Sequence, residues 1–234
     1  MSHHDAKNTG WLNINKPIDL TSCTVVNILK RRFDLKKHKI KIGHAGTLDP
    51  MATGVLPIAL GRENTKMIDI LMNAEKEYDF TIQFGIQTCS GDITGKVIEN
   101  HDLDSSAISL DKVKEVIKEF IGEIEQTPSK YSAIKINGVR AYDLARSNID
   151  FQMKKRKISI YHLEVLNVDS DLKQASLLVT CSKGTYVRSL GEDISVKLGT
   201  IGTLIQLNRR RVGSFNQSSS INPFEATIEN LLQI

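Results

Sequence analysis

Apolar residues that alternate with polar ones mark the clearest strand of the chain. Between residues 78 and 84 the alternation is unbroken, and a period of two predicts a strand with one buried face. Compact or alternating apolar runs predict further strands at residues 12–15, 55–60, 158–168 and 175–181. The last two are joined by a polar turn, so we expect them to form a hairpin.

Helical spacing of apolar residues predicts three helices. The first begins at Thr21 or Ser22 as its N-cap and ends in a basic cluster. A long helix is expected over residues 113–124, and a short one over 190–198, closed by Gly199. Strands separated by single helices and hairpins favour an α+β fold with a mixed, mainly antiparallel sheet.

The composition narrows the class of protein. The chain has 234 residues, 40% hydrophobic and 25% charged, which is ordinary for a globular protein. No apolar run approaches the roughly 18 residues of a membrane span, and the polar first ten residues lack a secretory signal, so we expect a cytoplasmic protein. Cys23, Cys89 and Cys181 are widely spaced, which favours reduced thiols over disulfides or a zinc site.

Positive charge is concentrated in two segments. Residues 30–41 hold seven basic residues and one aspartate, and residues 130–157 hold eight basic residues and two aspartates, so each segment carries +6. Because the whole chain carries +4, the remainder carries 4 − 12 = −8. This segregation favours a phosphate-binding face, although solvated charge runs are the ordinary alternative. Arg209, Arg210 and Arg211 add a third basic cluster. Tyr131, Tyr142 and Phe151 interleave with the second segment, which suits a nucleic acid.

A glycine-punctuated loop contains one carboxylate, Asp49. The loop reads Gly-His-Ala-Gly-Thr-Leu-Asp-Pro-Met-Ala-Thr-Gly over residues 43–54. Its glycines allow unusual backbone conformations and close approach by another molecule, and Pro50 stiffens the turn. The loop therefore presents Asp49 for chemistry, unless the aspartate only bonds its own backbone in an Asx-turn.

This loop resembles the catalytic motif of the TruB tRNA pseudouridine synthases, which act on the uridine at position 55 in the T-arm of tRNA. Further stretches resemble motifs of the same family in the same order. They are Asn15-Lys16-Pro17, Lys76-Glu77-Tyr78, Pro128-Ser129-Lys130-Tyr131, Gly184-Thr185-Tyr186-Val187-Arg188 and Leu207-Asn208-Arg209-Arg210. The resemblance covers the chain from about Gly10 to Phe215.

The resemblance implies the pseudouridine synthase fold, with helices flanking the sheet and a mobile thumb inserted at about residues 126–157. It implies one catalytic domain over residues 10–234, preceded by a disordered tail at residues 1–9. Many bacterial relatives continue into a PUA domain, whereas we expect none in this chain. Asp19 stands where the family's N-terminal motif commonly has glycine, and aspartate tolerates the left-handed backbone that such a position requires.

The resemblance also implies a chemistry. Asp49 would be the nucleophile that attacks a flipped-out uridine, at uracil C6 or ribose C1′. Arg188 would supply the positive charge paired with it. Tyr78 would stack on the uracil and reach the C5 proton. No cofactor and no metal are expected.

The remaining expected site residues would bind the substrate. Tyr186 and Leu207 would wall the pocket, and His44 would either touch RNA or support its loop. The other expected contacts are Lys16, Gly46, Thr47, Lys130 and Tyr131. We expect a monomer that recognises the T-arm stem-loop; the alternatives are an RNA-binding or tRNA-folding protein without catalysis, and a pseudouridine synthase acting on another RNA.

Overall fold

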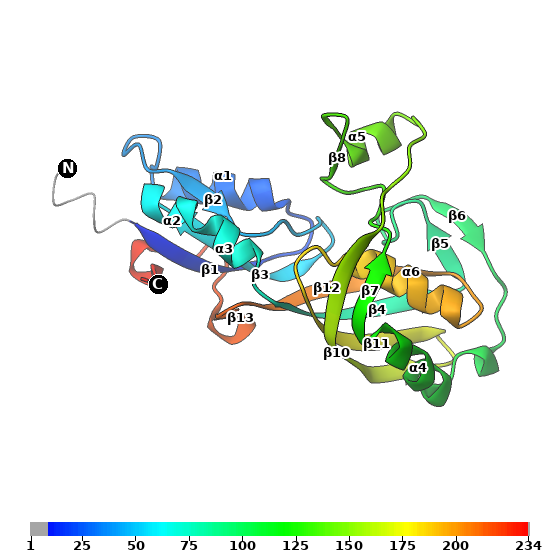
Figure 1. Cartoon of the computed structure of the whole chain (residues 1–234). Helices are drawn as coiled ribbons and strands as arrows, with labels where there is room; N and C mark the ends of the chain where they lie inside the picture. The colour runs from blue at the N-terminus through cyan, green and yellow to red at the C-terminus, as the bar shows by residue number, and fades with distance from the viewer. Residues whose placement is uncertain (1–8, 234) are drawn as a thin grey trace. The chain divides into compact units, whose positions relative to one another are not determined.

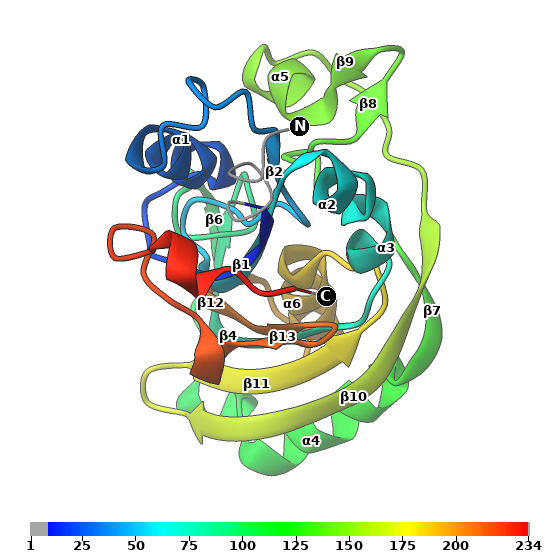
Figure 2. The same ribbon diagram turned by 90° about the vertical axis from the view of Figure 1, so that its left-hand side faces the viewer.

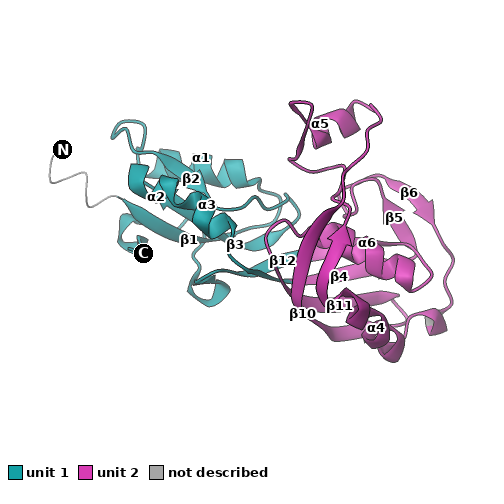
Figure 3. Cartoon of the chain, viewed as in Figure 1, with its two compact units in different colours: residues 1–78, 207–234 teal, residues 79–206 magenta. Residues whose placement is uncertain are grey.

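The computed structural model describes residues 9–233 (Figure 1). The chain forms two compact units: Met1–Tyr78 with Leu207–Ile234, and Asp79–Gln206 (Figure 3). Two strands, β4 (Lys76–Phe84) and β12 (Gly202–Val212), run through both units. The expected disordered tail lies outside the described residues except for Thr9, whose carbonyl accepts a hydrogen bond from Gln233. A single catalytic domain over residues 10–234 stays a prediction.

The first unit is built around β3. This strand pairs antiparallel with β1 and β2, and parallel with the second half of β12, where Gly54 lies opposite Arg209. Trp11 and Phe215 pack with their ring centroids 5.8 Å apart in a small core beneath α3. The elements of this unit are β1 (Gly10–Lys16), α1 (Ser22–Arg32), β2 (Ile42–His44), β3 (Thr53–Leu60), α2 (Arg62–Lys66), α3 (Ile68–Met72), β13 (Phe215–Asn216), η4 (Gln217–Ser219) and η5 (Ile228–Asn230).

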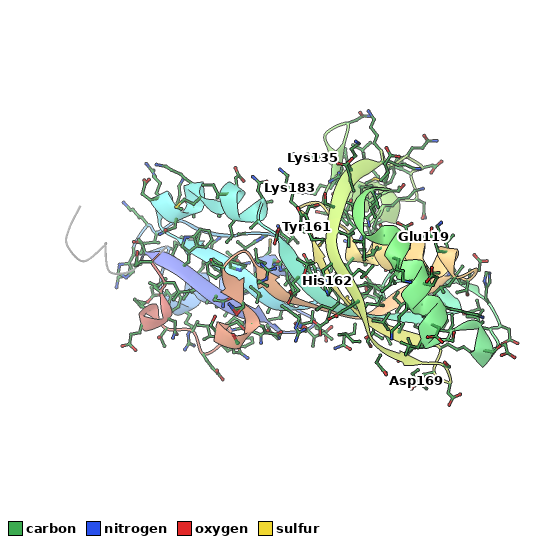
Figure 4. The ribbon with its side chains drawn as sticks, turned by 60° about the horizontal axis from the view of Figure 1, so that its bottom comes forward. Glu119, Lys135, Tyr161, His162, Asp169 and Lys183 are labelled. Atoms are coloured by element: carbon green, nitrogen blue, oxygen red, sulfur yellow. The ribbon has the colours of Figure 1, made fainter. Side chains whose placement is uncertain are left out.

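The second unit carries the strand order β12-β4-β11-β10-β7. Helix α4 lies along β10 (Figure 2). The strand β10 has a bulge between Ile160 and His162, which leaves Tyr161 exposed near its middle, and it ends at Asp169 (Figure 4). The other elements are β5 (Ile86–Thr88), β6 (Val97–Asn100), η2 (Ser105–Ala107), α4 (Leu110–Ile117), η3 (Lys118–Phe120), β7 (Gly122–Gln126), β8 (Lys135–Ile136), β9 (Val139–Arg140), α5 (Ala141–Arg146), β10 (Arg156–Asp169), β11 (Gln174–Cys181) and α6 (Val187–Lys197).

The α+β class and the mainly antiparallel sheet are confirmed, and each predicted strand is present. The predicted helix over residues 113–124 is wrong beyond its first half. Helix α4 ends at Ile117, and a 3₁₀ turn continues to Phe120. Ile121 is extended and Gly122 adopts a φ of 107°, and the edge strand β7 begins there. Ile124 then lies opposite Ile158 of β10. Its spacing matched a helix, but pairing with β10 decides its conformation.

The predicted thumb contains more regular structure than its sequence suggested. The short strands β8 and β9 form a hairpin whose turn residues, Asn137 and Gly138, both have positive φ. An Asn-Gly pair favours this type of hairpin turn, so the dipeptide was the signal that could have revealed it. Helix α5 follows directly, with Ala141 buried, and the hairpin and helix project from the second unit (Figures 1 and 2). Mobility of the thumb stays a prediction.

Candidate active site

The Asp49 loop, residues 43–54, is anchored to the first turn of α1. Thr21 is the N-cap, because its side chain accepts a hydrogen bond from the Thr24 amide. The next residue, Ser22, is buried; its hydroxyl accepts from the Leu48 amide at 2.9 Å and donates to the Leu48 carbonyl at 3.3 Å. The loop is therefore fixed one residue before Asp49, which is itself half-buried.

Lys16 anchors the same loop from the other side of Asp49. Its side chain has no exposed surface, and its ammonium donates to the carbonyls of Pro17 (2.9 Å), Leu20 (2.6 Å) and Pro50 (3.2 Å). Burial lowers the pKa of Lys16 to about 8, against the attraction of Asp49 and Asp19. The geometry makes Lys16 an internal brace of the loop, and its expected contact with substrate stays a prediction.

The turn between Lys16 and α1 has the form expected from its sequence. Asp19 adopts a φ of 64°, in the left-handed region that glycine commonly serves. Its amide donates to the Pro50 carbonyl at 2.9 Å. Asp19 therefore takes the place of glycine without loss of the turn, and it adds a negative charge near Lys16.

Arg209 is a buried part of the loop's support, although its sequence suggested a surface cluster with Arg210 and Arg211. Its side chain is 1% exposed, and it donates to the carbonyls of Val55 (2.8 Å) and Gly46 (2.9 Å). The expectation of a third surface cluster is thus wrong for Arg209. The signal that could have revealed it is the arginine's place in an apolar strand pattern, where a buried cation needs carbonyl partners.

His44 ends β2 and enters the loop. Burial, with a smaller effect of Arg209, lowers the pKa of His44, so the imidazole is neutral at pH 7. Its buried Nδ1 has no hydrogen-bond partner within residues 9–233. Further along the loop, the Gly46 carbonyl accepts a hydrogen bond from Arg209. Thr47, the next residue, is exposed. Both expected roles of His44, contact with RNA and support of its loop, stay predictions.

In the second unit, Arg188 lies in the first turn of α6 and is 4% exposed. Its guanidinium donates to the carbonyls of Ser90 (2.7 Å) and Tyr131 (3.0 Å), and it lies 3.6 Å from the Asp92 carboxylate. The Asp92 side chain is equally buried. Arg188 therefore connects three parts of the unit: helix α6, the turn after β5 and the start of the thumb.

Tyr186 is held by a residue that sequence reasoning missed. Gln126 is fully buried at the end of β7; its side chain accepts from the Tyr186 amide at 2.8 Å and donates to the Tyr186 carbonyl at 3.1 Å. Arg156 lies over the Tyr186 ring at 5.9 Å. Nothing in the sequence marked Gln126 as a site residue, because it is uncharged and lies outside the motifs that resemble the family.

The other expected substrate contacts lie in different surroundings. Tyr131 is half-buried, and a hydrogen bond with the Cys89 side chain, together with burial, raises its pKa. Lys130 is exposed and makes an ion pair with Asp150 at 3.2 Å. Tyr78 and Leu207 are 8% and 5% exposed, on β4 and β12, the strands that run through both units.

Two carboxylates on α6 have unusual protonation. Burial raises the pKa of Glu192 to about 7, reinforced by Asp193 and opposed by Arg188. Burial also raises the pKa of Asp193 to about 6, against the attraction of Lys155. Glu192 lies over Gly91, where an added Cβ would come within 2.7 Å of its Oε1. Within the described part of the chain, no three histidine, cysteine or acidic side chains form a group that could hold a metal ion.

The sequence model of the TruB family pseudouridylate synthases (N-terminal domain) matches residues 30–187. The chain belongs to this family. It is 44% identical to tRNA pseudouridine synthase B of Caulobacter vibrioides over 95% of its own length and 68% of the relative. It is 45% identical to tRNA pseudouridine synthase B of Rickettsia bellii over 92% of its length and 70% of the relative. Membership identifies the chain as an isomerase of the pseudouridine synthase class.

Two solved structures resemble this chain in fold. A chain of a Cbf5-Nop10-Gar1 complex is 30% identical, with a TM-score of 0.70, over 95% of this chain and 54% of that one. A chain of an H/ACA RNP bound to a substrate RNA is 28% identical, with a TM-score of 0.66, over 94% of this chain and 52% of that one. The pseudouridine synthase fold is thereby confirmed. Among residues 9–233, every helix is too short or too polar to span a bilayer.

Proposed function

We propose that this chain converts uridine to pseudouridine at position 55, in the T-loop of tRNA. The proposal is supported by the names of its relatives, which are tRNA pseudouridine synthases. The observation that carries it is the loop around Asp49. Two buried cations bind the loop's carbonyls on either side of the aspartate, Arg209 at Gly46 and Lys16 at Pro50.

The chemistry needs an ionised carboxylate held in one place. Asp49 attacks uracil C6 or ribose C1′ of the extruded nucleotide, and the bond between C1′ and N1 breaks. The base turns, C5 bonds to C1′, and the bond to Asp49 breaks, which releases the carboxylate. The proton then leaves C5, and N1 takes up a proton. Pseudouridine contains the same atoms as uridine, so the reaction needs no external group donor. Lys16, whose charge attracts Asp49, favours the carboxylate form.

The other residues serve binding and proton transfer in this proposal. Tyr78 stacks on the uracil, and its hydroxyl takes part in removing the C5 proton. Arg188 supplies positive charge, and its carbonyl and Asp92 partners hold the guanidinium rigid. Tyr186, Leu207, His44, Thr47, Lys130 and Tyr131 contact the RNA or wall the pocket. Extrusion of the uridine costs a few kcal/mol, which stacking and backbone contacts offset.

Site mapping tests the proposal. Unmodified tRNA transcript is incubated with the protein, and pseudouridine is located by chemical mapping. We expect one modified position, uridine 55, and no modification when that uridine is replaced by cytidine. Pseudouridine at another position, or in another RNA offered in competition, would assign a different substrate. Light scattering during size exclusion checks the monomeric state that we propose for the enzyme.

A further inference from the structure

A basic hollow of about 810 Å³ lies at the C-terminal end of α1 in the first unit. We call it the α1 hollow. Four cations and one carboxylate line it, so its net charge is strongly positive. Its lining residues are Asn27, Lys30, Arg31, Asp34, Lys36 and Lys37.

The backbone of the α1 hollow is ordered by its own hydrogen bonds. Leu35 is 2% exposed, and it anchors the turn that follows α1. Its amide donates to the Lys30 carbonyl at 3.1 Å, and its carbonyl accepts from the Ile40 amide at 3.0 Å. Asp34 and Lys39 adopt φ values of 49° and 52°. A turn that holds two such residues is shaped by its surroundings and presents its lysines in a defined arrangement.

The cations of the α1 hollow lack acidic partners. No ion pair within residues 9–233 involves a basic residue of the segment 30–41. The helix dipole favours cations in the last turn of α1, which accounts for Lys30, Arg31 and Arg32. It does not account for Lys36 and Lys37, which lie beyond the end of the helix. Cations without acidic partners around a hollow suit phosphate groups.

Helix α1 sets the distance between the α1 hollow and the Asp49 loop. Its first residue, Ser22, is bonded to Leu48 in the loop, and its last residue, Arg32, adjoins the hollow. Eleven residues at a rise of about 1.5 Å each span about 16 Å. At this separation a phosphate bound in the hollow belongs to a different nucleotide from the one that reacts at Asp49.

We propose that the α1 hollow binds the phosphate backbone of the substrate's stem, away from the uridine that reacts at Asp49. The proposal rests on the proposed function for the identity of that uridine. It assigns to Lys36 and Lys37 a sequence-independent electrostatic contact that sets affinity and register without taking part in the chemistry.

The test compares Lys36→Gln/Lys37→Gln with Lys96→Gln/Lys114→Gln, which removes two exposed charges elsewhere in the chain. Affinity for unmodified tRNA is measured over a salt series, together with kcat and KM. We expect the hollow variant to bind about tenfold more weakly at low salt, with a salt slope reduced by about 1–2 and an unchanged kcat. Affinity and slope equal to those of the control variant would overturn the proposal.

The dependence of affinity on stem length gives a second test, because a general loss of positive charge would not change that dependence. Wild-type protein should lose affinity when the stem of a T-arm hairpin is shortened from five base pairs to two, and the hollow variant should be nearly insensitive to the change. Equal sensitivity of the two proteins would place the contact elsewhere. Site mapping on the same samples distinguishes this proposal from the proposed function. If another uridine is modified and the hollow variant still binds more weakly, the proposed function is contradicted, whereas phosphate binding by the α1 hollow is supported.

Discussion

The two basic segments carry the same formal charge, and the structure makes them different. In residues 30–41 the cations are exposed at the end of α1 and beyond it, without acidic partners in the described chain. In residues 130–157, Lys130 pairs with Asp150 at 3.2 Å and Lys157 pairs with Glu123 at 2.8 Å. Charge counted along a sequence therefore overstates what the second segment offers to phosphate.

Acidic and aromatic partners, some within the second segment and some on neighbouring elements, account for the difference. Glu123 lies on β7, and Asp193, which faces Lys155, lies on α6. Arg156 and Arg146 lie over the rings of Tyr186 and Tyr142, at 5.9 and 5.6 Å. These contacts tie cations of the second segment to neighbouring side chains, so part of its charge serves internal structure. The first segment has cations that are free for a partner.

The largest effect is expected from Asp49→Asn, which tests catalysis and leaves both basic segments unchanged. Asp49→Asn keeps the shape of the loop and removes the nucleophile, so turnover should fall by at least about 10³-fold. Affinity for tRNA should remain within a few-fold, because the phosphate contacts are intact. Single-turnover assays and filter binding measure the two quantities. Appreciable turnover in a sequence-verified preparation would refute the assignment of Asp49.

Tyr78→Phe has the next largest expected effect. The variant keeps a stacking ring and loses the hydroxyl, so removal of the C5 proton should slow by about 10²-fold with binding little changed. Rates are measured at saturating tRNA, where affinity does not contribute. If the variant is as fast as wild type, Tyr78 is a stacking residue only.

The comparison itself is tested by two charge-matched variants. One changes Lys30, Arg31, Lys36 and Lys37 to glutamine, and the other changes Lys154, Lys155, Arg156 and Lys157. Both should weaken binding and flatten its salt dependence, because fewer counterions are released. The first should have the larger effect on the salt slope, since its cations are unpaired. A larger slope change in the second variant would reverse the comparison.

The smallest expected effect concerns stability. Because the pKa of Glu192 is raised from 4.5 to about 7 in the folded chain, its protonated form favours folding. That stability is complete below pH 4.5 and is lost as the pH rises through 7. Glu192→Gln, which mimics the protonated form, should therefore match wild type at pH 4.5 and exceed it by ~1–2 kcal/mol at pH 8. Urea unfolding measures this, with the exposed Glu229→Gln as control; a pH-independent difference contradicts it.

Much of the fold follows from local patterns in the sequence. The alternation at residues 78–84 predicted β4, and the apolar runs on either side of residues 169–173 predicted the hairpin of β10 and β11. The N-cap at Thr21 and the Asp49 loop could also be predicted from the sequence. In each of these the residues that determine the structure lie next to one another, so a local pattern contains the information.

Contacts between distant segments decided the rest. Ile124 has helical spacing but joins a strand because β10 pairs with it. Lys16 and Arg209 look like surface cations, yet each is buried against carbonyls of the Asp49 loop, 34 and 163 residues away from Pro50 and Gly46. Burial of a charged group depends on which carbonyls the folded chain brings to it. The sequence by itself therefore determined the Asp49 loop and the neighbouring strands, whereas only the tertiary structure decided which cations brace that loop and which stay exposed.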